Sequence, residues 1–313
     1  MTRHSGGPRL GLFASSVATA AALVVSTTAP VATASTTTTA PPRRSAVSTT
    51  HLTFVDTSRR TPATTTQPAD DQRVLVTTIR YPTDATAPLP LIVLAHGLNG
   101  HPDMLDDLME TWASAGFVVA APEFPRTNVG ANGKALLADA SQYPGDLSFV
   151  ITEMLAANAA PGPLEGKIDP THLGAAGISL GGMAVYGLVT NTCCIDPRVD
   201  AAILMSAVRP SFPSGRYVRQ QIPVMLIHGD ADTGYRYSVA AYPTLGTPKW
   251  FVTLHGGRHG PPFEDEPDEF DAFVRATTTA FWQRYLAGDR SAAARIVAGV
   301  KASTGKASLR RRL

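Results

Sequence analysis

The chain has 313 residues, of which 44% are hydrophobic and 17% are charged, which is enough apolar sequence for one sizeable core. Residues 51–300 hold 18 of the 27 basic residues and all 25 acidic ones, so this part carries a net charge of about −7. Phosphate binding needs clustered lysine and arginine, so we expect no nucleic-acid partner.

Residues 1–34 read as a signal peptide. Arg3, His4 and Arg9 form a positive start, an apolar stretch follows at 10–25, and residues 32–34 (Ala-Thr-Ala) offer a cleavage site. The apolar stretch is shorter than the roughly 20 residues that a membrane span needs. We therefore predict a secreted, extracellular protein with no stable membrane span; a retained N-terminal anchor is the alternative.

The composition predicts three further segments. Residues 35–50 form a Thr/Pro-rich tether with little to pack. Residues 51–288 form a single catalytic domain. Residues 289–313 form a basic C-terminal tail, which we expect to be a disordered, solvated end; contact with a membrane or cell wall is the alternative.

Strand-like and helix-like segments alternate along residues 51–288. Two opening strands rich in β-branched residues are followed by six continuous apolar runs, which suit strands covered on both faces. The expected strands are 51–57, 73–82, 89–97, 117–124, 172–179, 201–207, 222–230 and 249–257. Apolar residues recur at helical spacing at 147–155 and at 270–281, where Thr277 is the polar member of its face. This alternation predicts an α/β fold with a doubly wound, mostly parallel sheet and helices on both faces.

A short motif surrounds one serine at the end of a predicted strand. The spacing Gly177-Ile178-Ser179-Leu180-Gly181 fits G-x-S-x-G, a sharp strand-to-helix turn that lifts a serine hydroxyl above a sheet. The glycines suit such a turn because a side chain there would clash with the neighbouring strand. On these five residues alone, a glycine-rich turn after a buried strand is an equal alternative.

Other predicted strand ends carry histidine and aspartate side chains, the residue types that act with a catalytic serine. His96 follows one apolar run, Asp230 and Asp232 follow another, and His255 and His259 follow the last. Ligands of such sheets lie outside the carboxyl ends of the strands. The chain order Ser, Asp, His is that of an α/β-hydrolase. The set favours catalysis over the glycine-rich turn.

Together these segments give a family resemblance. HGLNG, WASAGFVVAAPEFP, YPGDLSFVITEML, GISLGG, HGDADTG and GGRHG resemble secreted serine hydrolases of the α/β-hydrolase superfamily. Within that superfamily the chain resembles the platelet-activating-factor acetylhydrolase-like and chlorophyllase-like esterases, and the bacterial cutinase-like polyesterases. Ile178 departs from many relatives, which place histidine or tryptophan there.

The chemistry assigns roles to three side chains. Ser179 is the expected nucleophile, which needs a base to take its proton. We assign His259 as that base because its short glycine-rich loop can reach the turn, whereas we expect His255 to point into or under the sheet. Asp232 matches the family's G-x-x-D position and is the acid that orients the base. Asp230 is expected to fix the turn by bonding backbone amides.

Two backbone amides are the expected oxyanion donors. They are the N–H groups of Leu180, directly after the nucleophile, and Leu98, after His96 and Gly97. We expect His96 to hold its loop, and we assign no function to His228 or His101.

No cofactor or metal is expected. The adjacent Cys193 and Cys194 are either free thiols or a vicinal disulfide, and cannot form a metal site alone. The acids at 263–271 favour the start of the last helix, where its dipole attracts them; a calcium site is the alternative.

We therefore expect a secreted serine carboxylesterase that hydrolyses esters of short to medium acyl chains and lipid-like esters through an acyl-enzyme. A cutinase-like polyester hydrolase and a non-catalytic binding protein on the same fold are the alternatives. Only 14 residues, 208–221, separate two strands where many relatives insert a cap. We thus predict no large cap domain and an open cleft at Ser179, in a protein that we expect to be monomeric.

Overall fold

The computed structural model describes residue 11 and residues 45–131, 134–207 and 212–313. Contacts divide the chain into two units, Met1–Pro42 and Arg43–Leu313. The predicted signal peptide, apart from Gly11, and the first ten residues of the predicted tether lie outside the described residues.

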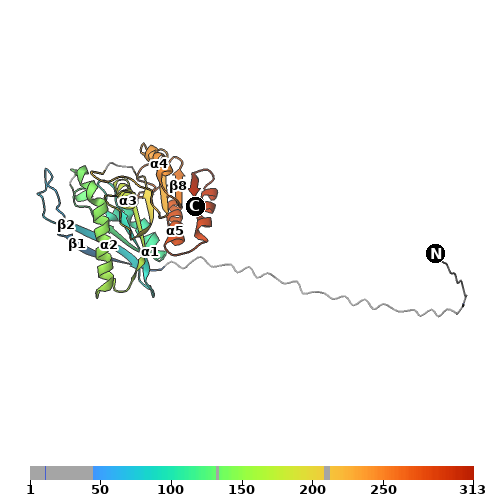
Figure 1. Ribbon diagram of the computed structural model, residues 1–313, viewed down its shortest axis with the longest axis horizontal. Coiled ribbons are helices and arrows are strands. Elements are labelled where there is room, and N and C mark those ends of the chain that lie inside the picture. Colours follow the sequence, from blue (N-terminus) through green and yellow to red (C-terminus); the bar gives the residue numbers. More distant parts are fainter. Residues whose placement is uncertain (1–10, 12–44, 132–133, 208–211) are drawn as a thin grey trace, which may run out of the picture. The chain divides into compact units, whose positions relative to one another are not determined.

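The described residues form one nine-stranded sheet in the order β1-β2-β4-β3-β5-β6-β7-β8-β9. The strands are β1 Val47–Asp56, β2 Arg73–Pro82, β3 Leu89–Ala95, β4 Val118–Pro122, β5 Ile168–Ile178, β6 Val199–Met205, β7 Val224–Gly229, β8 Lys249–Leu254 and β9 Ala307–Arg312. The central strands from β4 to β8 run parallel, while β2 is antiparallel to both its neighbours and β9 is antiparallel to β8. In Figure 1, β1 and β2 lie at the left of the domain and the red C-terminal elements at the right.

Helices cover both faces of this sheet. The α-helices are α1 Asp106–Ser114, α2 Tyr143–Ala159, α3 Leu180–Thr190, α4 Tyr235–Ala241, α5 Asp271–Tyr285 and α6 Ala292–Ala302. Short 3-10 helices are η1 Pro102–Leu105, η2 Val129–Ala131, η3 Leu137–Gln142 and η4 Tyr242–Thr244.

The two faces have separate hydrophobic cores. Along β3, Leu91 and Val93 pack on the side of α2 and α3, whereas Ile92 and Leu94 pack on the side of α1, α5 and α6. Successive side chains of a strand point to opposite faces, so a strand buried on both sides must be apolar throughout. This explains the continuous apolar runs and confirms the predicted doubly wound, mostly parallel α/β fold.

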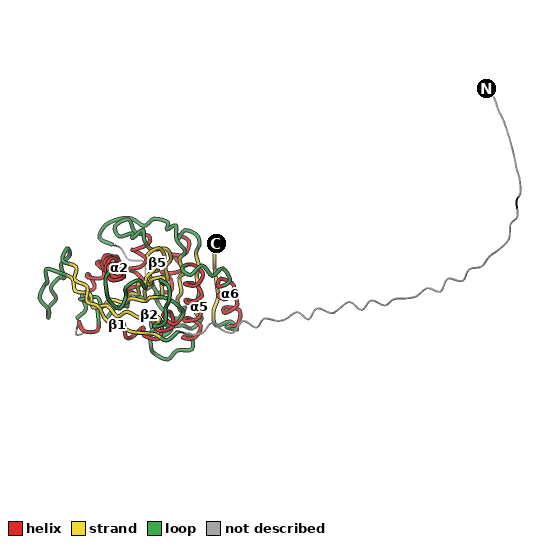
Figure 2. The backbone as a smooth tube through the Cα atoms, turned by 90° about the horizontal axis from the view of Figure 1, so that it is seen from below, coloured by secondary structure: helices red, strands yellow, loops and turns green. Residues whose placement is uncertain are grey.

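Residues 289–313 are folded, so the prediction of a disordered C-terminal tail is wrong. Residues 289–313 contain α6, which packs beside α5 (Figure 2), and β9, which pairs along the full length of β8. Ile296 is buried in the core, and Leu309 packs against it. The guanidinium groups of Arg310 and Arg311 lie 4.6 and 5.3 Å from the ring centroids of Phe251 and Trp250. Cation–π contacts of this kind keep arginine in the fold instead of in a solvated tail.

The predicted tether boundary is also wrong. β1 begins at Val47, and Val47–Thr50 pair with β2, so the domain starts before residue 51. The threonines and valine here are β-branched and suit a strand at the edge of a sheet.

A buried ion-pair cluster fastens β2 to the helices on one face. The Arg73 guanidinium donates to the carboxylates of Asp139 and Asp146, and all three side chains are fully buried. Burial raises the pKa of Asp146, although Arg73 beside it opposes that rise. Paired charges with satisfied hydrogen bonds are the form in which a core tolerates such groups.

Candidate active site

Ser179 lies at the turn between β5 and α3. Its backbone angles are φ 55° and ψ −115°, a left-handed conformation that is costly for a residue with a Cβ. The Ser179 N–H donates to the carbonyl of Met205 at 3.0 Å, which anchors the turn to the end of β6. The sequence around the serine therefore forms the predicted strained strand-to-helix turn.

The glycines of this turn are required by close backbone approaches. A Cβ at Gly181 would lie 2.1 Å from the carbonyl oxygen of Ala95 in β3. A Cβ at Gly177 would lie 2.3 Å from the carbonyl carbon of Gly181. Neither position can hold a side chain without moving the backbone, as the sequence motif predicts.

The structure brings together the three predicted catalytic side chains from three different strand ends. His259 Nε2 lies 2.9 Å from Ser179 Oγ, and His259 Nδ1 lies 2.5 Å from Asp232 Oδ2. A carboxylate can only accept, so the Nδ1 proton of His259 faces Asp232 and the Nε2 lone pair faces the serine hydroxyl. The imidazole is 46% exposed, whereas the Asp232 side chain is only 6% exposed.

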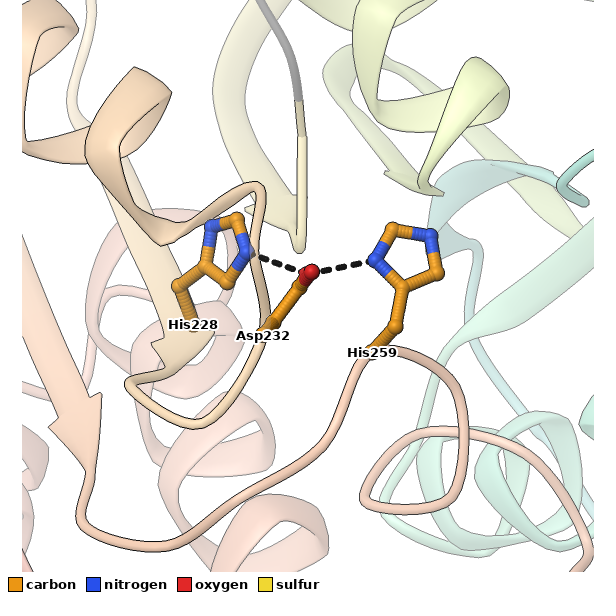
Figure 3. A group of neighbouring side chains, drawn as sticks. All are labelled: His228, Asp232 and His259. Atoms are coloured by element: carbon orange, nitrogen blue, oxygen red, sulfur yellow. Dashed lines mark hydrogen bonds and ion pairs between the residues drawn. The ribbon is translucent and has the colours of Figure 1, made fainter.

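The Asp232 carboxylate is held by more donors than the sequence indicates. Its Oδ1 accepts from the Gly234 N–H at 2.8 Å, and its Oδ2 accepts from both His259 and His228. Figure 3 shows the carboxylate between the two imidazole rings. Burial alone would raise the pKa of Asp232, but the hydrogen bonds from Gly234, His259 and His228 outweigh it and hold the pKa below its usual value.

His228 is the site residue that sequence reasoning missed. It lies in β7, its side chain is fully buried, and Nε2 lies 2.7 Å from Asp232 Oδ2. A histidine four residues before the acid, inside an apolar strand, was the available signal, because buried polar side chains have partners.

A second aspartate–histidine pair lies at the same edge of the sheet. Asp230 Oδ2 lies 2.7 Å from His255 Nδ1, and Asp230 Oδ1 accepts from the Gly256 N–H. Asp230 thus bonds a backbone amide as expected. The expected position of His255 is wrong: it follows the end of β8 and its side chain is 43% exposed, because Asp230 holds it at the surface.

The two expected oxyanion donors flank the serine. Leu180 begins α3, where the first N–H groups have no partner in the helix. A Cβ at Gly97 would lie 3.2 Å from the Ser179 Cβ, which places the residue before Leu98 against the serine. Within the described part of the chain, neither amide donates to a protein acceptor. Their role toward an oxyanion stays a prediction.

His96 holds the loop that carries Leu98. The Phe124 N–H donates to His96 Nε2 at 3.2 Å, so the proton of the neutral ring is on Nδ1 and donates to the Gly97 carbonyl at 2.7 Å. Burial lowers the pKa of His96 to about 4. His101, also without an assigned role, accepts from the Asp103 N–H at the start of η1 and pairs with Glu123.

The acids of 263–271 have divided roles. Asp265 accepts from the N–H groups of Asp106 and Asp107 at the start of α1, while Asp271 lies in the first turn of α5. None of the acids at 263–271 belongs to a group that could hold a metal: in the described ranges, the only three histidine, cysteine or acidic side chains with ligand atoms within 4.8 Å of one another are His228, Asp232 and His259. Their nitrogen–oxygen distances of 2.5 and 2.7 Å are those of direct hydrogen bonds.

The structure also describes the two cysteines and most of the segment in which many relatives insert a cap. Cys193 and Cys194 form a vicinal disulfide. Among described residues 212–223, which follow β6, none is helical; residues 208–211 lie outside the description.

No helix in the described part of the chain is long and apolar enough to cross a membrane.

No protein-family model and no curated protein matches this chain. Among solved structures, a ferulic acid esterase from Streptomyces cinnamoneus is similar, with a TM-score of 0.65 and 20% sequence identity. The match covers 87% of this chain and 98% of that chain. This chain therefore shares the α/β fold of that structure, with a mixed, mostly parallel sheet between two layers of helices.

Proposed function

We propose that this chain is a secreted serine carboxylesterase that forms an acyl-enzyme on Ser179. The observation that carries the proposal is the continuous line of hydrogen bonds from Ser179 Oγ through His259 to Asp232, on a strained turn at the carboxyl end of the sheet. The chain order of these residues and the esterase fold point in the same direction.

The reaction follows from the proton positions. Ser179 Oγ attacks the ester carbonyl carbon while His259 Nε2 takes the hydroxyl proton. Asp232 stabilises the resulting imidazolium, and the N–H groups of Leu98 and Leu180 bind the oxyanion. The imidazolium then protonates the leaving alcohol. A water molecule, deprotonated by His259, then attacks the acyl carbonyl carbon; the bond to Ser179 Oγ breaks, the serine oxygen takes the proton back from the imidazolium, and the carboxylic acid is released.

The test of the mechanism is the serine itself. Ser179→Ala should reduce ester turnover at least about 1,000-fold while leaving the melting temperature almost unchanged, since loss of a triad member costs several orders of magnitude. An organophosphate probe should label the native chain at Ser179, read by peptide mass spectrometry. An unlabelled, inactive native chain would favour a non-catalytic binding protein.

The substrate class is proposed from the surroundings of the serine. Leu180 directly follows Ser179, and Leu98 follows Gly97, which lies against the serine; apolar residues next to the nucleophile suit short to medium aliphatic acyl chains. A series of p-nitrophenyl esters of two to twelve carbons would locate the optimum. Methyl ferulate belongs in the same panel because the structural neighbour is a ferulic acid esterase.

A polyester hydrolase is the second candidate. The observation in its favour is the short, non-helical segment 212–223 after β6, where a helical cap would limit large substrates. Release of soluble acids from polycaprolactone films would support it. Efficient turnover of small esters with no film hydrolysis would contradict it.

Export is proposed from the first 34 residues. Expression of the full chain in a bacterial host should give a mature protein that begins at Ser35, detected by its intact mass in the medium. Recovery of the uncut chain in the membrane fraction would instead favour a retained anchor.

A further inference from the structure

The proposed catalytic acid binds two imidazole groups with one oxygen. Asp232 Oδ2 lies 2.5 Å from His259 Nδ1 and 2.7 Å from His228 Nε2 (Figure 3). Only His259 contacts the serine. The ester-hydrolysis scheme above gives the second histidine no task.

His228 occupies a closed environment with a partner on each ring nitrogen. Its side chain has no exposed surface, its Nδ1 lies 2.7 Å from Ser238 Oγ, and its ring packs edge-on against Tyr235 at 5.8 Å. Burial lowers the pKa of His228 and so favours the neutral ring with one proton.

The position of that proton is fixed by the chemistry of the partners. A carboxylate offers no proton, so His228 Nε2 must carry the hydrogen that points to Asp232. His228 Nδ1 then accepts from the Ser238 hydroxyl at 2.7 Å; the other acceptor near this hydroxyl, the Ala207 carbonyl oxygen, lies farther from Ser238 Oγ, at 3.4 Å. The carboxylate thus requires the tautomer with the proton on Nε2, and the Ser238 hydroxyl stabilises that tautomer by donating to Nδ1.

We propose that His228 is a positioning residue for the catalytic acid, and that Ser238 keeps it in the donating tautomer. The carboxylate accepts one hydrogen bond on each oxygen, from His228 on Oδ2 and from the Gly234 N–H on Oδ1. Together these bonds orient Oδ2 toward His259 Nδ1. Without His228, the carboxylate has one fewer donor and can rotate away from the base. This inference rests on the proposed serine-esterase function.

The decisive experiment compares two substitutions of similar shape. Glutamine and methionine are both unbranched, but only glutamine carries an N–H group at the position of Nε2. His228→Met should lower kcat about 10- to 100-fold with KM changed less than threefold, the loss expected for a hydrogen bond to a charged group. His228→Gln should stay within about threefold of the native kcat. His255→Met, in the exposed second pair, is the matched control and should leave kcat unchanged.

The outcomes separate a positioning role from packing. Equal losses in His228→Met and His228→Gln would assign His228 to packing alone and overturn the proposal, and native activity in both would overturn it too. If His228→Met does not fold, Ser238→Ala decides: it should lower kcat several-fold, with Ser238→Thr retaining activity because it keeps the hydroxyl. An unchanged kcat in Ser238→Ala would then count against the proposal.

The proposed function can fail separately. A native protein that hydrolyses no ester and takes up no organophosphate probe would end both proposals. A native protein that is active, with inactive Ser179→Ala and unaffected His228 variants, would overturn only the role of His228.

Discussion

Two aspartates two residues apart allow a sharp test of the proposed acid. Asp232 receives three N–H donors, from His259, His228 and Gly234. In Asp232→Asn, a single carbonyl oxygen replaces two carboxylate oxygens, so the new NH2 group must face at least one of these N–H donors. If it faces His259, it stabilises the tautomer with the proton on Nε2, which cannot accept the proton of Ser179.

The expected loss of kcat in Asp232→Asn follows from the lost negative charge and from the wrong tautomer of His259. We expect kcat to fall about 1,000- to 10,000-fold, or about 4–5.5 kcal/mol of transition-state stabilisation. Asp230→Asn is the control, because it removes the same charge from a surface pair that contacts no serine. Its cost should be at most about 1 kcal/mol of stability, with kcat within about twofold of the native value.

The assay is the initial rate of p-nitrophenyl butyrate hydrolysis over a range of concentrations, with the melting temperature of each variant measured in parallel. A larger loss of kcat in Asp230→Asn than in Asp232→Asn would refute the assignment. So would an Asp232→Asn variant that keeps more than a tenth of the native kcat.

Two further predictions concern stability. The pKa of His96 is lowered by burial to about 4 from an ordinary 6.5, so between these values the unfolded chain binds a proton that the folded chain does not. Stability should therefore fall as the pH drops from 7 to 4, with about 3 kcal/mol of that fall absent in His96→Asn; urea unfolding at both pH values measures the difference. Gly181→Ala should lower stability by at least about 2 kcal/mol because its Cβ would meet the Ala95 carbonyl, whereas Gly299→Ala, whose nearest neighbour is a Phe273 ring atom at 3.9 Å, should raise it by about 0.5–1 kcal/mol. Thermal unfolding of the pair checks this, and an equal effect in both would contradict the steric argument.

Most of the architecture could be predicted from the sequence because the parallel strands are covered by helices on both faces. A strand such as β3 must then be apolar at every position, which makes it visible as a run. The expected helix at 147–155 proved to be the middle of α2, and the run at 73–82 matched β2 at both ends.

The C-terminal elements could not be predicted in the same way. Ser308, Arg310, Arg311 and Arg312 are exposed on β9, so its pattern reads as a charged tail. What holds it is backbone pairing with β8 and arginine stacked on rings that lie some 60 residues earlier in the chain. Pairings this distant leave no local signal.

The residues of the proposed site could likewise be predicted only in part from the sequence. Ser179, Asp232 and His259 were predictable because each follows a recognisable strand end, and the structure brings them within hydrogen-bond distance. The further hydrogen bonds made by the aspartates of this edge of the sheet could not be predicted. Whether His228 meets Asp232, or Asp230 meets His255, depends on how tightly two loops turn, and spacing alone does not fix it.

The arginines of β9 also determine where the sheet stops. β9 is the last strand on its side of the sheet, so its outer N–H and C=O groups offer a template to any further strand. A second copy adding there in parallel register would bring two sets of Arg310, Arg311 and Arg312 side by side without an acidic partner on the strand. Like charges opposed across a strand pair repel one another. Arg310 and Arg311, which stack on aromatic rings of the fold, thus also disfavour the addition of such a copy at the open edge.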